Sequence, residues 1–321
     1  MPDPFEPADL SRIRTEPLAR RVHKVAVDAF ASPCQEGGSL AAFLDGLSDV
    51  LAVRELRGLA RAVVAARAGG RPVVWAMGAH PVKVGVSPLL IQLMRRGAIS
   101  ALVLNGAGAI HDWEIAAVGS TSEEVGPGLD EGLFGVAEET GRELSEAARE
   151  AQRRHEGLGQ ALARRAAAAG LPHARHSLLA TAGELDLPLL VHVAIGSDTV
   201  HTHPAADGAA IGEASLQDFR RLCGLLGRAE GGVWINCGSA VLLPEVFLKA
   251  LNAARNLGHR VHSLTTANLD MQRHYRVERN VLERPTRRGG RSFNLIGHHE
   301  INVPLLAAAI LLESRRENLC G

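Results

Sequence analysis

Leu102-Val-Leu-Asn-Gly-Ala-Gly-Ala-Ile-His-Asp112 begins as a short apolar run, breaks into glycines and ends in polar side chains. The same change occurs in Leu189-Leu-Val-His-Val-Ala-Ile-Gly-Ser-Asp198 and in Val233-Trp-Ile-Asn-Cys-Gly-Ser239. Each stretch is typical of a buried strand that ends in a turn. Because helical stretches separate them, we predict an α/β fold with a single doubly wound, mostly parallel sheet. Such sheets bind ligands at the carboxyl ends of their strands, which places the predicted site on these three turns.

The remaining segments extend this alternation. We expect strands at 72–77, 100–104, 188–193, 232–236, 260–265 and 293–296, and helices at 39–66, 88–96, 215–227, 243–257 and 304–312. The alanine-rich stretch 131–168 predicts two helices that separate near Gly157-Leu-Gly159. We interpret the polar stretch 266–290, which is only weakly periodic, as a long loop at the active site or at a subunit contact. The chain then has a lead segment, 1–38, and a single α/β domain, 39–321.

Composition favours a small molecule as the partner. The 321 residues are 46% hydrophobic, enough for a large core, and 35 basic residues balance 35 acidic ones. This balance, with 284–291 as a short basic stretch, argues against nucleic acid as the main partner. The cysteines Cys34, Cys223, Cys237 and Cys320 form no paired motif, and we find no signal peptide or apolar run of membrane length. We expect a cytoplasmic protein without a membrane partner.

The strongest polar cluster is Val200-His-Thr-His-Pro-Ala-Ala-Asp-Gly208. His201 and His203 stand two residues apart, so both lie on one side of an extended segment. With Asp207 they could hold a metal ion that keeps an open position. A ligand-binding or acid–base role, and plain hydrogen bonding within a loop, are the alternatives. In His298-His299-Glu300 the side chains diverge if the segment is extended, and Glu300 suits the first turn of a helix.

Two further segments offer ligand contacts. The turn after Leu104 has small residues where the backbone must approach a ligand, followed by a helix amino end that would suit a phosphate, although tight turns also need glycine without a ligand. The chain has only three lysines, Lys24, Lys83 and Lys249. Lys83 follows a predicted strand in Gly78-Ala-His-Pro-Val-Lys-Val-Gly85, where its amine could contact phosphate or carbonyl groups or remain solvated.

In order and spacing, residues 70–312 resemble the deoxyhypusine synthase family. The resemblance is carried by Gly78-Ala-His-Pro-Val-Lys-Val-Gly-Val-Ser-Pro88, by the Asn105–Asp112 turn in place of the family's Thr-Ala-Gly-Gly turn, by Cys237-Gly-Ser239 and by Pro304-Leu-Leu306. It implies a Rossmann-like fold, NAD as cofactor and a homotetramer. The residues expected to contact the dinucleotide are Gly78, Gly106, Ala107, Gly108, Asp198, Gly238, Ser239 and His298.

The chain departs from that family at its catalytic positions. The family forms an imine on a lysine of its late loop, but this chain has no lysine after Lys249, and Leu242-Leu-Pro244 stands where the family has a histidine pair. We therefore predict an NAD-dependent oxidoreductase or transferase for a small polar substrate, an amine being one candidate, rather than deoxyhypusine synthesis. The predicted catalytic residues are His201, His203, Asp112 and Lys83. A metal-dependent hydrolase built on His201, His203 and Asp207, and a non-catalytic NAD-binding oligomer, are the alternatives.

Overall fold

The structure is a computed structural model that describes residues 5–317; residues 1–4 and 318–321, Cys320 among them, lie outside the described part. The chain divides between Val50 and Leu51 into two compact units. The first contains the short 3-10 turns η1 (Leu10–Arg12), η2 (Leu18–Arg20) and η3 (Val27–Ala29) and the helix α1 (Leu40–Asp45), which Ser39 caps. The division therefore falls after α1, later than the end of the expected lead segment.

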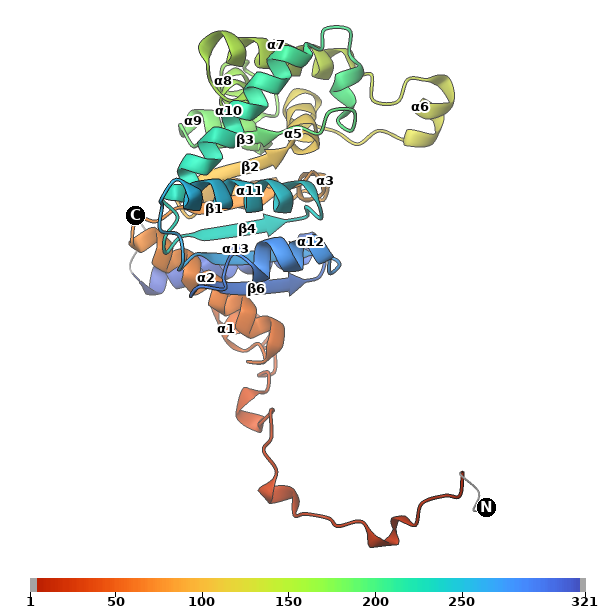
Figure 1. Cartoon of the computed structure of the whole chain (residues 1–321), viewed down its shortest axis with the longest axis vertical. Helices are drawn as coiled ribbons and strands as arrows, with labels where there is room; N and C mark the ends of the chain where they lie inside the picture. The colour runs from red at the N-terminus through yellow and green to blue at the C-terminus, as the bar shows by residue number, and fades with distance from the viewer. Residues whose placement is uncertain (1–4, 318–321) are drawn as a thin grey trace. The chain divides into compact units, whose positions relative to one another are not determined.

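The second unit is built on a six-stranded, all-parallel sheet in the order β3-β2-β1-β4-β5-β6 (Figure 1). Its strands are β1 (Val73–Met77), β2 (Ala101–Asn105), β3 (Leu189–His192), β4 (Val233–Cys237), β5 (Thr265–Asp270) and β6 (Arg291–Ile296). This order is that of the Rossmann fold, and its direction reverses between β1 and β4. The predicted doubly wound α/β sheet is confirmed.

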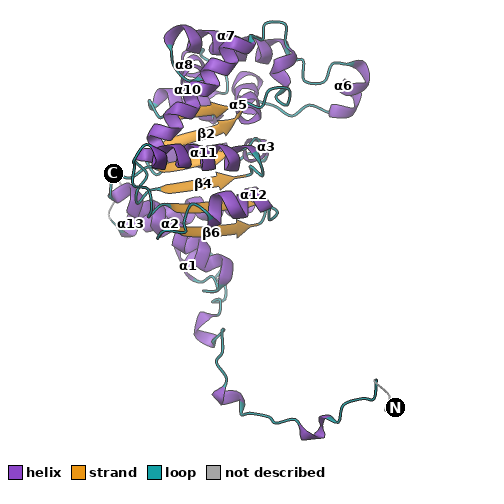
Figure 2. Cartoon of the chain, viewed as in Figure 1, coloured by secondary structure: helices purple, strands orange, loops and turns teal. Residues whose placement is uncertain are grey.

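Helices cover both faces of the sheet (Figure 2). The α-helices of this unit are α2 (Leu51–Ala68), α3 (His80–Lys83), α4 (Ser87–Arg95), α5 (Gly106–Val118), α6 (Val125–Glu131), α7 (Glu138–Arg154), α8 (Leu158–Ala168), α9 (Leu178–Glu184), α10 (Gly208–Gly227), α11 (Leu242–Asn256), α12 (Tyr275–Val277) and α13 (His299–Arg316). Shorter turns are η4 (Ala174–His176), η5 (Thr199–Thr202) and the π-helical η6 (Glu278–Glu283). One face packs against α10, α11, α12 and η6, and the other against α2, α4, α5, α9 and α13.

The strands are apolar along their length because both faces are covered. Every residue of β1 is buried, as parallel sheets between two helical layers require. Trp75 belongs to the core on one face, whereas Trp234 stacks on Phe247 at 4.3 Å on the other. Burying a large apolar side chain contributes about 1.5–3 kcal/mol, so these two layers hold the strand ends in a fixed arrangement.

A buried carboxylate closes the β3 edge of the sheet. Asp218 of α10 accepts hydrogen bonds from the amides of Val191 in β3 (2.9 Å) and Gly159 in α8 (2.8 Å). Burial raises the pKa of Asp218 to about 7, against the lowering effect of these two amides. An edge strand left unpaired would invite association with another chain, and here α8 and α10 cover it.

The last third of the chain differs from the prediction. Strand β5 begins at Thr265, not at 260, because the amides of His262 and Ser263 donate to the Glu230 carboxylate instead of to a neighbouring strand. The expected loop 266–290 is largely ordered as β5, α12 and η6. Its polar residues satisfy one another inside the sheet: Asn268 of β5 bonds to Asn236 of β4 and to Asn294 of β6. That loop prediction was wrong.

The expected helix 39–66 is also interrupted. Gly46 ends α1, and α2 starts at Leu51, which has a positive φ of 40°. The expected pair of helices in 131–168 is present as α7 and α8, with Gly157 between them. Within residues 5–317, no helix combines the length and apolarity that crossing a bilayer requires.

Candidate functional site

The point where the strand order reverses is closed by the protein's own backbone. A Cβ added to Gly78, just past β1, would lie 2.3 Å from the carbonyl oxygen of Gly238, just past β4. Gly238 itself has a φ of +63°, and a Cβ there would lie 3.1 Å from both His299 Nε2 and Pro81 Cδ. The two glycines are therefore needed for the close packing of these turns, whatever ligand binds beside them.

The two histidines after β6 differ in burial: His298 is exposed and His299 is buried. His298, predicted to contact the dinucleotide, is exposed at the N-cap position of α13, and Glu300 lies in the first turn of this helix, as expected. His299 is buried, with Nε2 3.1 Å from the Leu269 carbonyl and its ring edge-on to His80 at 5.3 Å. Burial lowers the pKa of His299, so its ring is neutral and holds α13 against the sheet. Ser239 likewise has an internal partner, since its hydroxyl accepts from the Leu243 amide at 3.3 Å.

The glycines after β2 belong to a helix. Asn105 caps α5 by accepting from the Gly108 amide (2.8 Å), so Gly106, Ala107 and Gly108 form its first turn and not an extended loop. Asp198 lies against this turn: a Cβ on Gly106 would come within 2.1 Å of its Oδ2. Gly106 is thus required for the approach of Asp198.

Asp198 brings a negative charge to the amino end of α5, the place where a phosphate was expected. The carboxylate accepts from the Ala194 amide at 2.8 Å. Burial raises the pKa of Asp198, while the amides of Ala194 and Ala107 and the nearby His201 act against that rise. A helix amino end attracts an anion, but an anion already bound there repels a second one beside it. This terminus therefore favours a hydroxyl or an ammonium group as the ligand of Asp198.

The structure disperses the predicted histidine cluster. His203 Nε2 lies 3.1 Å from Glu138 of α7, and its Nδ1 accepts from the Ala205 amide. Asp207 caps α10 by accepting from the amides of Ala209 and Ala210. His201 lines a chamber of about 20 Å³ together with Gly106 and Asp198, and its buried Nδ1 has no partner in the described chain. A chamber of this size holds a single water molecule.

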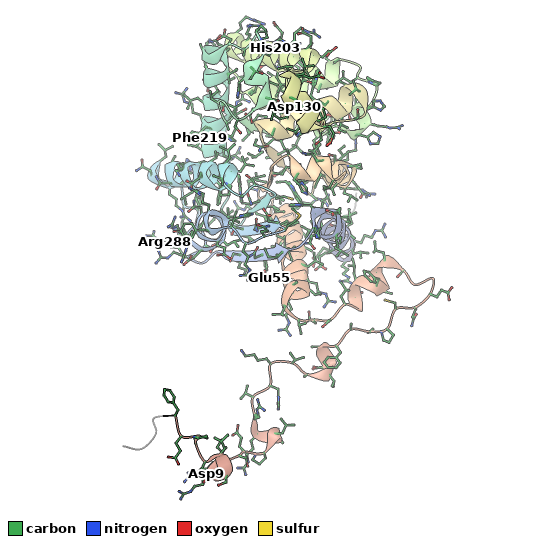
Figure 3. All side chains as sticks on the ribbon, turned by 90° about the vertical axis from the view of Figure 1, so that its right-hand side faces the viewer. Asp9, Glu55, Asp130, His203, Phe219 and Arg288 are labelled. Carbon is green, nitrogen blue, oxygen red and sulfur yellow. The ribbon has the colours of Figure 1, made fainter. Side chains whose placement is uncertain are left out.

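These positions give the hydrolase alternative no support. Within residues 5–317 no three His, Cys, Asp or Glu side chains are grouped as a metal site requires. Figure 3 shows His203 at the α7 end of the unit, far from Arg288 in the basic stretch 284–291. The strand order agrees, since β3 and β6 are the two opposite edges of the sheet.

Asp112 has a structural position. Its side chain is fully buried and accepts a hydrogen bond from the Ser177 hydroxyl (2.5 Å). It also accepts from the amides of Leu178 (2.8 Å) and Leu179 (2.9 Å), the first two residues of α9. Burial raises the pKa of Asp112 to about 6, and the three hydrogen bonds oppose the rise. No substrate reaches a carboxylate enclosed in this way, so we do not carry Asp112 forward as a proton acceptor.

A cavity of about 960 Å³ lies beyond β2 and β3, beside α5. It brings together three of the predicted site residues, Lys83, Ala107 and Asp198. The Lys83 side chain is exposed and has no ion-pair partner in the part of the chain that the structure describes. Figure 1 shows α6, which begins at the lining residue Val125, standing away from the sheet on the side where the strands end. The cavity lies within the size range of small-molecule sites.

Three lining residues were not predicted from the sequence. His111 and Glu114, three residues apart, lie on one face of α5, and Thr121 follows the left-handed turn at Gly119 (φ 76°). His111 Nδ1 is 2.6 Å from the Thr121 hydroxyl, which donates to Glu114. The signal for this cluster was the i, i+3 spacing of a histidine and a glutamate just inside the helix that follows the glycine turn.

Most charged residues of the cavity lining are acidic. Four carboxylates reach it, and Lys83 is the single lysine or arginine in the described lining; the acidic residues are Glu114, Glu123, Glu139 and Asp198. Burial alone would raise the pKa of Glu114, but hydrogen bonds from His111 and Thr121 hold it below its usual value. Glu114 is therefore a carboxylate at neutral pH, and the charge of the cavity is complementary to an amine.

Comparison with known proteins places the fold. No protein-family model matches the chain, and no curated protein matches its sequence. A "conserved putative LOR/SDH protein" from Methanococcus maripaludis S2 is similar in structure, with a TM-score of 0.54 and 14% identity over 83% of this chain and 72% of that one. A "putative deoxyhypusine synthase" from Entamoeba histolytica aligns with a TM-score of 0.51 and 9% identity, over 86% of this chain and 94% of that chain.

A third similar structure contains ligands. The ternary complex of AgrE with ornithine and NAD+ aligns with a TM-score of 0.55 and 15% identity, over 83% of this chain; the chain spans about a third (34%) of AgrE. Because the sequence identities are 15% or lower, these similarities establish a shared fold and nothing more. The predicted resemblance is thus confirmed at that level: this chain has the Rossmann-like architecture that it shares with a protein described as a deoxyhypusine synthase.

Proposed function

We propose that this protein is an NAD-dependent enzyme acting on a small polar substrate that carries an amine. The observation that supports it most is the cavity at the carboxyl ends of the strands, where an unpaired lysine, a buried carboxylate and a histidine meet. Ligands of open α/β sheets bind at this edge. The structural likeness to AgrE, whose complex contains ornithine and NAD+, agrees in both cofactor and substrate class.

The residues present fit a dinucleotide. Lys83 would hold its phosphates, because an ammonium without an internal partner is available to an anion. Asp198 would accept a ribose hydroxyl, the usual role of an acidic residue in such sites. Bound NAD supplies an acceptor for hydride, while this chain supplies orientation, charge and a group that takes the proton.

The acidic lining selects the substrate. An ammonium group entering the cavity meets Glu114 and Glu139, and desolvation in a partly enclosed site strengthens that attraction. We therefore extend the proposal to amines such as ornithine or arginine. The homotetramer implied by the sequence resemblance remains a separate proposal.

The first test is ligand-dependent stability. A ligand that binds only the native state at a hundredfold excess over its dissociation constant adds about 2.7 kcal/mol to the free energy of unfolding. We expect NAD to raise the melting temperature of protein shown by mass spectrometry to be free of dinucleotide. No shift at millimolar NAD or NADH would contradict the proposal.

The second test concerns Lys83. A lost hydrogen bond to a charged group costs about 1.5–3 kcal/mol, so Lys83→Ala should weaken NAD binding at least about tenfold. Lys249→Ala is the matched control, since Lys249 is also an exposed lysine but pairs with Glu245 on α11. Equal affinity of the two variants, measured by calorimetry, would remove Lys83 from the site.

A further inference from the structure

We propose that His111 is the catalytic base of this cavity, with Thr121 and Glu114 as the residues that position it. The inference rests on the proposed function and names the residue that takes the substrate's proton. Neither His111 nor its two partners was among the residues expected from the sequence. The hydrogen-bond chain they form, and the cavity that it faces, carry the inference.

The hydrogen bonds fix the tautomer of His111. The hydroxyl of Thr121 has one proton and donates it to Glu114, which is a carboxylate and can only accept. The Thr121 oxygen can then only accept from His111, so Nδ1, 2.6 Å away, carries the proton. The second oxygen of Glu114 is 3.4 Å from the Thr140 hydroxyl, which fixes the carboxylate from the other side.

In the neutral ring this tautomer leaves Nε2 with a free lone pair, while Nδ1 also lies 3.5 Å from the Glu114 carboxylate. Within the described residues Nε2 has no hydrogen-bond partner, and it is not buried. About a fifth (20%) of the His111 side chain is exposed. The ring lines the same cavity as Lys83 and Asp198. A base needs an accessible lone pair and a fixed orientation, and His111 has both.

The other histidines near the cavity lack one of these properties. His203 is paired with Glu138 and outside the cavity lining. His201 lines the small chamber of about 20 Å³, which has room for a single water molecule. His111 therefore has the best geometry among the candidates, although the sequence pointed to the other two.

The reaction balances with NAD as the oxidant. The substrate ammonium passes one proton to His111 Nε2 and becomes a neutral amine. Bound NAD+ would supply the acceptor for the hydride that leaves the α-carbon, and the nitrogen lone pair would then form the C=N bond of an iminium product. The positive charge on the imidazolium is stabilised through Thr121 by the Glu114 carboxylate, as in other base–carboxylate pairs.

Two readouts test His111 without any turnover. In ¹⁵N–¹H correlation spectra of the full chain, the resonance lost in His111→Gln should be that of the Nδ1–H tautomer. Thr121→Val, which removes the bridging hydroxyl, should shift this resonance, and Thr121→Ser should restore it. Diethyl pyrocarbonate should modify His111, located by peptide mass spectrometry, and modify it more slowly in Thr121→Val. An Nε2–H tautomer, or a His111 that resists modification, would overturn the proposal.

The kinetic test uses NAD+ with L-ornithine. His111→Gln should lower kcat by about 10²–10⁴-fold while changing NAD affinity little, because a base acts on the proton and not on the cofactor. His259→Gln, at an exposed histidine outside the cavity lining, is the control. A His111→Gln enzyme with full kcat would refute the assignment. If the wild-type protein fails to bind NAD, the proposed function fails, and the tautomer and modification results still judge His111 on their own.

Discussion

Replacing Asp112 should destabilise the protein severely, since its carboxylate serves structure. Its oxygens accept from two backbone amides and one hydroxyl at the start of α9. In Asp112→Ala the amides of Leu178 and Leu179 lose their partner inside the core, at about 1–3 kcal/mol each, so we expect a loss of about 2–6 kcal/mol in the free energy of unfolding. Urea unfolding followed by tryptophan fluorescence measures it directly, because Trp75, Trp113 and Trp234 are all buried.

The same residue should leave a signature in the pH dependence of stability. Its pKa is raised from 3.8 to about 6 by burial, so the native state holds this proton more tightly than the unfolded chain does. The contribution is then fully present below about pH 4 and is lost as the pH rises through 6. A shift of this size corresponds to about 3 kcal/mol. Relative to Asp112→Asn, which cannot titrate, the wild type should lose that amount between pH 4 and pH 7.

The effect must be measured as the difference in the free energy of unfolding between the wild type and Asp112→Asn, because other buried groups titrate in the same pH range. Asp218, with a pKa raised to about 7 by burial, adds a loss of the same sign, whereas His192, with a pKa lowered to about 4 by burial, acts in the opposite direction. Both cancel between wild type and variant. Asp207→Ala, which removes a cap at a partly exposed helix end, is the control and should cost only about 1 kcal/mol. A flat difference curve, or an Asp112→Ala variant as stable as that control, would refute the structural role.

Three further outcomes follow from the geometry. Gly78→Ala places a Cβ 2.3 Å from a backbone oxygen that has to shift, so it should lower the free energy of unfolding by about 1–3 kcal/mol. Gly208→Ala, which has open space around its Cβ, is the control and should not. Equal melting temperatures of the two variants would contradict the close packing of the turns after β1 and β4. Gly106→Ala should displace the Asp198 carboxylate and weaken the binding of NAD while leaving the fold intact, and calorimetry with NAD would show it; unchanged affinity would remove Asp198 from the cofactor site. With NAD and spermidine, borohydride should trap no imine on 266–290, because this segment has no lysine; a trapped adduct there would contradict the assignment.

The alternation of apolar runs and glycine turns was sufficient to predict the sheet. Strands β1, β2, β3 and β4 begin or end within a residue or so of their expected limits, since buried parallel strands are continuous apolar runs. Strand β5 was missed because its sequence, Thr-Thr-Ala-Asn-Leu-Asp, is polar. The hydrogen bonds that join Asn236, Asn268 and Asn294 connect three neighbouring strands of the sheet, and no local sequence pattern contains them.

The candidate site was predicted only in part for a similar reason. Lys83, Ala107 and Asp198 were found because each follows a strand, and the carboxyl ends of parallel strands meet at one edge. Asp112 and Asp207 were misleading because a carboxylate after a glycine or proline turn serves equally well as a helix cap. His111 was overlooked beside Asp112, although His111 is partly exposed and Asp112 is fully buried: a helix turns by about 100° per residue, so the two neighbours point in different directions.

The closed switch point explains why the site lies toward β2 and β3. In a dinucleotide-binding sheet, a glycine-rich turn after the first strand lets a pyrophosphate approach a helix amino end. Here the turn after β1 leads into α3, which has only four residues, and its glycine packs against the backbone of Gly238. The longer helix α5 after β2 has its amino end filled by Asp198. In the proposed site, a bound cofactor would therefore obtain its positive charge from Lys83 instead of from a helix dipole, which makes Lys83→Ala the most informative single change.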